Sequence, residues 1–199
     1  MPRIVFIIIA AVSVVVAATA GRFWMMERDA STPGQAMRVN IGGPFSLVDH
    51  TGKAVTEKDY AGKYMLVYFG YTYCPDVCPT SLSIMAEALD QLSADELAKV
   101  VPIFITVDPE RDTAEVMASY VPNFHDKLVG LTGTTDQVKA AARAYKAYFA
   151  KVNEDDPDGN YTMDHSSTTY VMGPDGLYTA HFNHGTEAAI MAARLKEIL

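Results

Sequence analysis

Residues 64–80 of this 199-residue chain read YMLVYFGYTYCPDVCPT. The first part, Tyr64 to Phe69, is a continuous run of apolar and aromatic side chains, which is typical of a strand buried on both faces. Cys74 and Cys78 follow, and beyond them apolar residues recur at helical spacing from Leu82 to Leu92. The stretch therefore predicts a strand and then a helix, with both cysteines of the chain at the junction.

The elements on either side complete an α/β fold. A second apolar run, from Val101 to Val107, predicts a parallel neighbour for the first strand. Turn residues and apolar periodicity predict the rest: hairpins at 45–56 and 168–182, and helices at 112–120, where Asp112 and Glu115 form a capping box, at 135–147 and at 187–199. The order β-α-β followed by β-β-α predicts a thioredoxin-like three-layer fold with an N-terminal β-hairpin extension.

Composition and charge exclude several classes of protein. With 49% hydrophobic and 20% charged residues, the chain is neither disordered nor collagen-like. The formal net charge is -8, and it is unevenly distributed: four arginines against Glu27 and Asp29 give the first 40 residues +2, which leaves -10 for the remainder. An acidic body without a Lys/Arg-rich run argues against nucleic acid binding, because phosphate contacts require cationic side chains.

Residues 4–20, IVFIIIAAVSVVVAATA, contain no charged residue. We predict that residues 1–28 are a membrane anchor, because this run is longer than the core of a usual signal peptide. The alternative is a signal peptide cleaved after Ala20, since Ala18-Thr19-Ala20 fits the small-residue cleavage pattern. Either route exports the acidic domain. Residues 29–43 then form a polar linker, and residues 44–199 form the thioredoxin-like domain.

The C-x-x-x-C spacing of the cysteines favours chemistry over a structural disulfide. A disulfide that closes so short a loop removes only about 2 kcal/mol of unfolded-state entropy. A helix N-terminus favours thiolate over thiol, which makes Cys74 and Cys78 suitable ligands or nucleophiles. This spacing is one residue longer than the C-x-x-C of thioredoxin-type oxidoreductases, so both sulfurs can approach one metal ion, although a disulfide is not forbidden. Two soft thiolates suit Cu(I), whereas structural zinc requires four ligands.

Five histidines are candidates for a third ligand. The predicted strand 168–172 should run antiparallel to the strand ending at Phe69, which places His165 at the edge where the cysteine loop emerges. His181 and His184 are predicted on the same side, one strand spacing, about 4.8 Å, further away. The other two are predicted in a turn and a loop: His50 and His125. The expected third ligand is therefore His165.

Three motifs, FGYTYCPDVCPTSL, TVDPERDT and DHSSTTYVMGPDG, resemble in this order those of the Sco/SenC family of cytochrome oxidase assembly proteins, and the match runs from about Pro44 to the C-terminus. The resemblance implies a membrane-tethered, exported thioredoxin-like domain that binds one copper ion, Cu(I) or also Cu(II), through Cys74, Cys78 and His165. DHS matches the family segment that carries the histidine ligand.

The same resemblance implies a copper chaperone. Such a protein delivers copper to, or prepares the thiols of, the dinuclear copper centre of cytochrome c oxidase subunit II or a similar acceptor. Other copper chaperones or thiol reductants are the further partners implied. The expected location is the periplasmic side of a bacterial inner membrane, with the mitochondrial inner membrane as the alternative.

A second hypothesis is a thiol-disulfide oxidoreductase that acts on exported proteins without metal, with Cys74 and Cys78 as its catalytic residues. A thiol peroxidase is disfavoured, because the Thr expected three residues before the nucleophilic cysteine is Tyr71 or Pro75 here. Two acidic residues near the expected site have open roles: Asp108, which either orients the site or makes a turn, and Asp164, which fits a turn or hydrogen bond better than a ligand.

Overall fold

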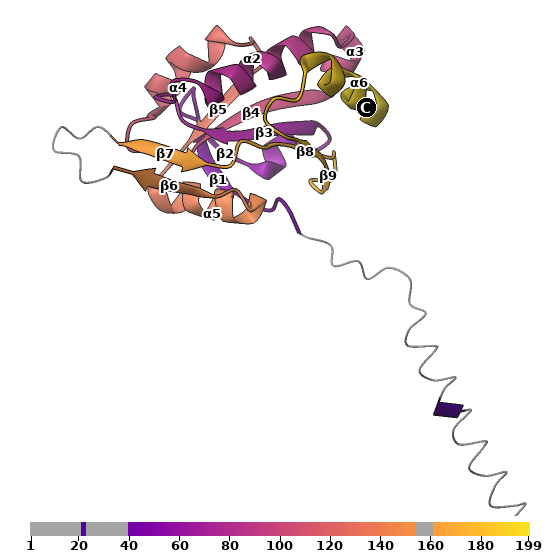
Figure 1. Ribbon diagram of the computed structural model, residues 1–199, viewed down its shortest axis with the longest axis horizontal. Helices are drawn as coiled ribbons and strands as arrows, with labels where there is room; N and C mark the ends of the chain where they lie inside the picture. The colour runs from indigo at the N-terminus through magenta and orange to yellow at the C-terminus, as the bar shows by residue number, and fades with distance from the viewer. Residues whose placement is uncertain (1–20, 23–39, 154–160) are drawn as a thin grey trace, which may run out of the picture. The chain divides into compact units, whose positions relative to one another are not determined.

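The computed structural model describes residues 21–22, 40–153 and 161–199, and the compact unit that contains the folded domain is Asn40–Leu199 (Figure 1). The predicted anchor and the linker up to residue 39 lie outside the described residues, apart from Gly21 and Arg22. None of the helices in the described part of the chain is long and apolar enough to cross a bilayer.

A seven-stranded mixed sheet forms the centre of the domain, in the order β2-β1-β5-β4-β3-β8-β9. The central strands β3 (Tyr64–Gly70) and β4 (Val100–Thr106) are parallel, as predicted, and β8 (Thr169–Met172) runs antiparallel to β3. The other strands are β1 (Ser46–Asp49), β2 (Ala54–Thr56), β5 (Val129–Thr132) and β9 (Tyr178–Phe182). The side chains from Leu66 to Phe69 are fully buried, which explains why β3 lacks polar alternation.

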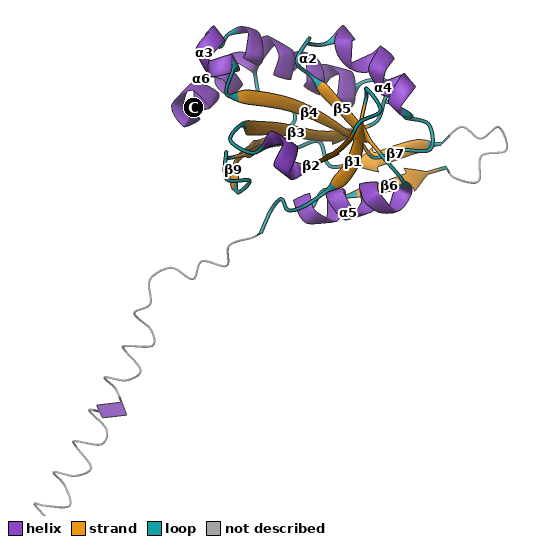
Figure 2. Ribbon diagram, turned by 180° about the vertical axis from the view of Figure 1, so that it is seen from behind, coloured by secondary structure: helices purple, strands orange, loops and turns teal. Residues whose placement is uncertain are grey.

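Helices cover both faces of this sheet, with α5 on one face and α2, α4 and α6 on the other (Figure 1, Figure 2). The helices are α2 (Val77–Asp90), α3 (Ala94–Leu97), α4 (Ala114–Tyr120), α5 (Thr135–Tyr145) and α6 (Ala188–Ile198), and the 3-10 turns are η1 (Glu57–Tyr60) and η2 (Val121–Asn123). The units β3-α2-β4 and β8-β9-α6 confirm the predicted order of elements. At the N-terminal end of the domain, β1 pairs antiparallel with both β2 and β5.

Three short strands were not predicted from the sequence. The first, β5, pairs parallel with β4, and a Cβ on its Gly130 would lie 2.8 Å from Val121 of η2. The other two, β6 (Phe149–Val152) and β7 (Thr162–His165), pair antiparallel in a separate two-stranded sheet. His165 is therefore the last residue of a strand that pairs with β6, opposite Phe149, shortly before β8 begins at Thr169.

Asp112 does not cap α4, so the predicted capping box is wrong. The N-cap is Thr113, whose side chain accepts a hydrogen bond from the Val116 amide at 3.3 Å. Asp112 is fully buried, and its carboxylate accepts hydrogen bonds from the Thr72 amide (3.0 Å), the Thr72 hydroxyl (2.5 Å) and the Thr106 hydroxyl (2.6 Å). A buried carboxylate requires such partners. The side chain thus joins the loop after β3 to the end of β4.

We expect Asp112→Ala to lower the free energy of unfolding by about 3 kcal/mol, because the partly buried donors on Thr72 and the buried hydroxyl of Thr106 lose their acceptor. Urea unfolding followed by circular dichroism measures the change. Glu115→Ala, at an exposed position of α4, is the matched control and should have a much smaller effect. Equal stability of the two variants would contradict the structural role of Asp112.

Candidate metal centre

The two cysteines lie at the carboxyl end of β3, where the chain turns into α2. Cys74 is in the connecting loop and is partly exposed, whereas Cys78 is the second residue of the helix and is fully buried. The Cys78 amide donates a hydrogen bond to the Cys74 sulfur (3.4 Å), which satisfies one of the amides that a helix N-terminus leaves without a helical partner. Pro79 follows in the first turn, where no amide hydrogen is needed. The strand, loop and helix predicted around the cysteines are all present.

The last residue of β3 makes room for the buried sulfur. A Cβ on Gly70 would lie 2.7 Å from the Cys78 sulfur and 2.9 Å from the Phe104 ring. Cys78 and Phe104 are both fully buried, so neither has free space into which it can move. Gly70 therefore sets how close Cys78 comes to the sheet. Gly70 was not among the residues predicted from the sequence, although a glycine between an apolar strand and a cysteine loop is a usable signal.

His165 reaches the cysteines from the end of β7. Its Nε2 lies 3.3 Å from the Cys78 sulfur, and its Nδ1 lies 3.1 Å from the Ser166 carbonyl oxygen. A carbonyl oxygen only accepts hydrogen bonds, so Nδ1 donates and Nε2 keeps the lone pair of the neutral ring. The rings of Tyr68 and Tyr71 stand edge-on to the imidazole, with centroid separations of 6.2 and 5.9 Å. The lone pair of Nε2 is therefore held at the cysteine loop.

Cys74, Cys78 and His165 form the one group of three or more possible metal ligands found in the described part of the chain, and their ligand atoms all lie within 4.8 Å of one another. Burial raises the pKa of the Cys78 thiol and lowers the pKa of His165. The expectation that the helix N-terminus favours thiolate at both sulfurs is thus wrong for Cys78, because burial is the larger effect. A bound cation would reverse this preference by compensating the buried negative charge.

The other histidines make contacts outside this cluster. Nδ1 of His184 lies 3.2 Å from the Ser81 hydroxyl. The remaining three have partners of their own at Nδ1: the Gly130 amide for His50, the Lys127 amide for His125 and the Tyr178 hydroxyl for His181. Asp164 is exposed on β7 and is not part of the cluster. The structure thus brings together the three residues predicted as ligands and none of the alternatives.

Asp108, whose role the sequence left open, holds the chain that leads into β7. Its buried carboxylate accepts hydrogen bonds from the Tyr161 hydroxyl (2.8 Å) and from Arg111 Nε. Arg111 also donates to the Tyr161 carbonyl oxygen (3.0 Å), and its guanidinium lies 4.9 Å from the centre of the Tyr73 ring. Because Tyr73 belongs to the cysteine loop, this group ties the loop to the strand that carries the histidine. Nothing in the local sequence pattern had singled out Arg111.

A model of the SCO1/SenC family matches residues 33–199. The chain belongs to the SCO1/SenC family. Among curated members, the mitochondrial SCO1 homolog of Homo sapiens is 46% identical over 156 residues, which cover 78% of this chain and 52% of that protein. The chain therefore spans about half the length of this SCO1/SenC relative.

Solved SCO1/SenC structures have the same fold. Arabidopsis thaliana ScoI with copper bound superposes with a TM-score of 0.74 and 42% identity, covering 79% of this chain and 98% of that one. Bradyrhizobium japonicum ScoI with copper bound gives a TM-score of 0.73 and 45% identity, covering 80% and 99%. Nearly all of each solved chain thus corresponds to about four fifths of this one. In this structure, residues 40–199 form one compact unit.

In the reduced, metal-free domain we expect iodoacetamide to modify Cys74 at least about tenfold faster than Cys78, because the Cys78 sulfur is fully buried and burial raises its pKa. Peptide mass spectrometry at successive times measures both rates. In urea, where both thiols are exposed, the rates should become similar. Faster modification of Cys78 in the folded domain would contradict the described geometry.

Proposed function

We propose that this protein is a copper chaperone, in which Cys74, Cys78 and His165 hold one copper ion. The acceptor is the dinuclear copper centre of cytochrome c oxidase subunit II or a similar site, to which the protein delivers copper or whose thiols it prepares. The observation that carries the proposal is the convergence of three ligand atoms within 4.8 Å, in a family whose Arabidopsis and Bradyrhizobium members have structures with copper bound.

The donor set fits copper better than the other common metals. Cu(I) prefers soft thiolates and accepts two or three ligands, and imidazole is also a good ligand for Cu(II). Burial lowers the pKa of His165, so the ring stays neutral and its Nε2 lone pair remains available. Two thiolates supply the negative charge that a copper ion requires in a buried position. The same residues therefore suit either oxidation state.

The uneven burial of the two sulfurs suits transfer of the ion. Cys78 is fully buried, whereas Cys74 is partly exposed and follows Tyr73, whose side chain is 63% exposed. A thiolate of an acceptor protein can approach the ion from the Cys74 side and add a ligand before another ligand leaves. Exchange of ligands in this order moves copper between proteins without releasing it to water.

The second function, thiol-disulfide exchange, is supported by the same asymmetry between the cysteines. The exposed Cys74 thiolate would attack a partner disulfide, forming a mixed disulfide and releasing one partner thiolate. The buried Cys78 would then attack the Cys74 sulfur, which forms the Cys74–Cys78 disulfide and releases the second partner thiolate. This reaction needs no metal and assigns no obligatory role to His165.

The substitution His165→Ala separates the two functions. We expect it to weaken copper binding and to block transfer to a purified acceptor domain with reduced cysteines, because one of three ligands is lost. Reduction of an oxidised acceptor should continue at a similar rate, since both thiols remain. Copper titration, acceptor loading and acceptor thiol counting on the same preparation provide the three measurements.

Cys74→Ser and Cys78→Ser are the controls in which both functions are lost, since each should abolish tight copper binding as well as disulfide reduction. His184→Ala is the matched histidine control and should leave both activities unchanged, because His184 contacts Ser81 and lies outside the cluster. If His165→Ala left copper delivery intact while the serine variants lost only reduction, the oxidoreductase function would replace the chaperone function.

We further propose that residues 1–28 anchor the exported domain to a membrane, on the periplasmic side of a bacterial inner membrane or, alternatively, in a mitochondrial inner membrane. The support is the run of uncharged, largely apolar residues 4–20. The full-length protein should stay in the membrane fraction after a high-salt wash, since apolar partitioning is insensitive to screening. Mass spectrometry identifies the mature N-terminus, and a chain that begins at Gly21 would show a cleaved signal peptide instead.

A further inference from the structure

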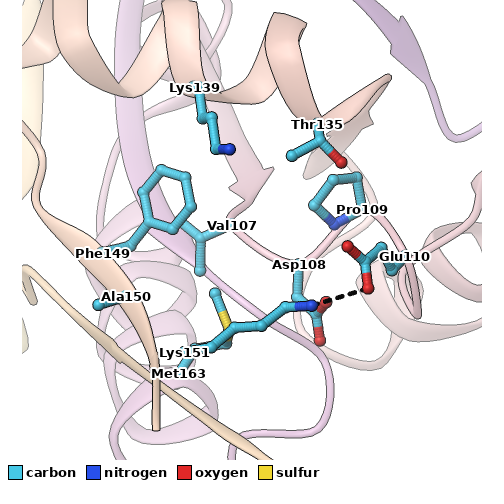
Figure 3. A pocket seen from close by; sticks show the side chains of 10 residues that line it. All are labelled: Val107, Asp108, Pro109, Glu110, Thr135, Lys139, Phe149, Ala150, Lys151 and Met163. Atoms are coloured by element: carbon cyan, nitrogen blue, oxygen red, sulfur yellow. Dashed lines mark hydrogen bonds and ion pairs between the residues drawn. The ribbon is translucent and has the colours of Figure 1, made fainter. Parts of the chain in front are cut away.

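A groove runs between helix α5 and strand β6, and nothing in the proposed copper chemistry uses it. It consists of two adjoining cavities of about 290 and 250 Å³ that share Lys139 and Phe149. In the larger cavity, the side chains of Lys139, from α5, and Phe149, from β6, face the same space (Figure 3). Arg143 and Tyr148 line the second cavity. We call this feature the α5–β6 groove.

The α5–β6 groove carries excess positive charge on an acidic protein. Its acidic residues already have cationic partners, because Glu110 pairs with Lys151 at 2.8 Å and Asp108 pairs with Arg111. Lys139 and Arg143 are four residues apart on α5, which places them on the same side of the helix. Both are exposed, and within the described part of the chain neither side chain has a hydrogen bond or an ion pair.

Among the described residues, Lys139 and Arg143 are therefore two adjacent cations without an ion-pair partner, in a chain whose formal net charge is -8. Two neighbouring cations beside a cavity attract anionic groups.

The groove also offers apolar contact area. Tyr148 is 62% exposed although it is a large aromatic residue, and Phe149 beside it is partly buried. Val107 and the largely buried Met163 complete the apolar lining of the larger cavity. Exposed aromatic side chains next to arginine are typical of protein interfaces, where they provide large contact areas at small entropic cost. A volume of about 290 Å³ is enough for one large side chain.

We propose that the α5–β6 groove is a docking site for an acidic peptide segment of a partner protein. Carboxylates of the segment pair with Lys139 and Arg143, and one aromatic or aliphatic side chain occupies the larger cavity. Charge complementarity directs the segment to the groove, because the rest of this acidic chain repels the carboxylates of the segment.

The groove is adjacent to the strand that positions the histidine. Phe149 pairs with His165 across β6 and β7, and the Tyr148 backbone exchanges hydrogen bonds with Ser166, at 2.9 Å to its amide and 3.0 Å to its hydroxyl. A docked partner segment would thus lie one strand away from the candidate metal centre. Binding of the peptide segment in the groove does not require copper. The experiment on the groove can therefore fail while the proposed copper function holds, and the reverse is also true.

The test uses metal-free residues 40–199 and a fluorescently labelled synthetic peptide of four glutamates around one phenylalanine. Fluorescence anisotropy gives its affinity, which should fall as salt is added. The double variant Lys139→Glu and Arg143→Glu should bind at least about tenfold more weakly. The control variant, Lys58→Glu and Lys196→Glu, makes the same change in net charge at exposed positions outside the groove and should bind within about twofold of the unsubstituted domain.

Further variants and ligands test whether the peptide binds in the groove and whether the groove prefers an acidic peptide. Tyr148→Ala should also weaken binding of the peptide, and a peptide with lysines in place of the glutamates should not bind. Equal weakening in the groove variant and the control variant would overturn the proposal, because binding would then follow net charge alone. Binding of the domain to phosphatidylglycerol vesicles through Lys139 and Arg143, with no binding of the acidic peptide, would also overturn it and would assign the groove to a lipid surface.

Discussion

The packing of the Cys78 sulfur against the end of β3 is the constraint on which the rest of the site depends. Gly70 leaves just enough space for this sulfur, since an added Cβ would lie 2.7 Å from it. Strand β3 cannot shift to relieve such a contact, because it is hydrogen-bonded to β4 on one side and to β8 on the other. The sheet therefore fixes one ligand of the candidate metal centre, and the other two are brought to it.

Polar contacts place the other two ligands. Asp112 binds the loop after β3 through Thr72, and this loop continues to Cys74. Arg111 and Asp108 bind the chain that leads into β7, at whose end His165 lies. Buried carboxylates with several donors hold their geometry tightly, because losing one donor leaves an uncompensated charge. Residues 108–112, between β4 and α4, thus connect both sides of the metal centre although none of them belongs to the ligand cluster.

The sequence predicted those features that depend on local signals. The apolar run of β3, the helical period after it and the placement of the cysteines between them are present in the structure as expected. The position of His165 at the cysteine edge followed from the antiparallel direction of β8, which the structure confirms. In contrast, β5, β6 and β7 have only four residues each, and no hairpin turn of the kind that marked β1–β2 and β8–β9 was recognised beside them.

The errors arose where a tertiary contact outweighed a local preference. The capping pattern assigned Asp112 to a helix end, but its burial against Thr72 and Thr106 decided its role. The helix N-terminus predicted a thiolate at Cys78, but burial raises the pKa of this thiol. Gly70 and Arg111 act through tertiary contacts. The position of Gly70 between an apolar strand and the cysteine loop was a usable local signal, but no local pattern marked Arg111.

His165 is carried by the two-stranded sheet β6–β7, which is separate from the seven-stranded sheet that fixes Cys78. The two residues are 87 positions apart in the chain, so an ion bound by both is a cross-link between two structural units. Small units of this kind open with a lower free energy than a central sheet, without global unfolding. Opening of β6–β7 would withdraw the imidazole while both sulfurs keep the ion. The time for which the ion stays bound would then depend on the free energy of opening β6–β7 as well as on the strength of the metal–ligand bonds.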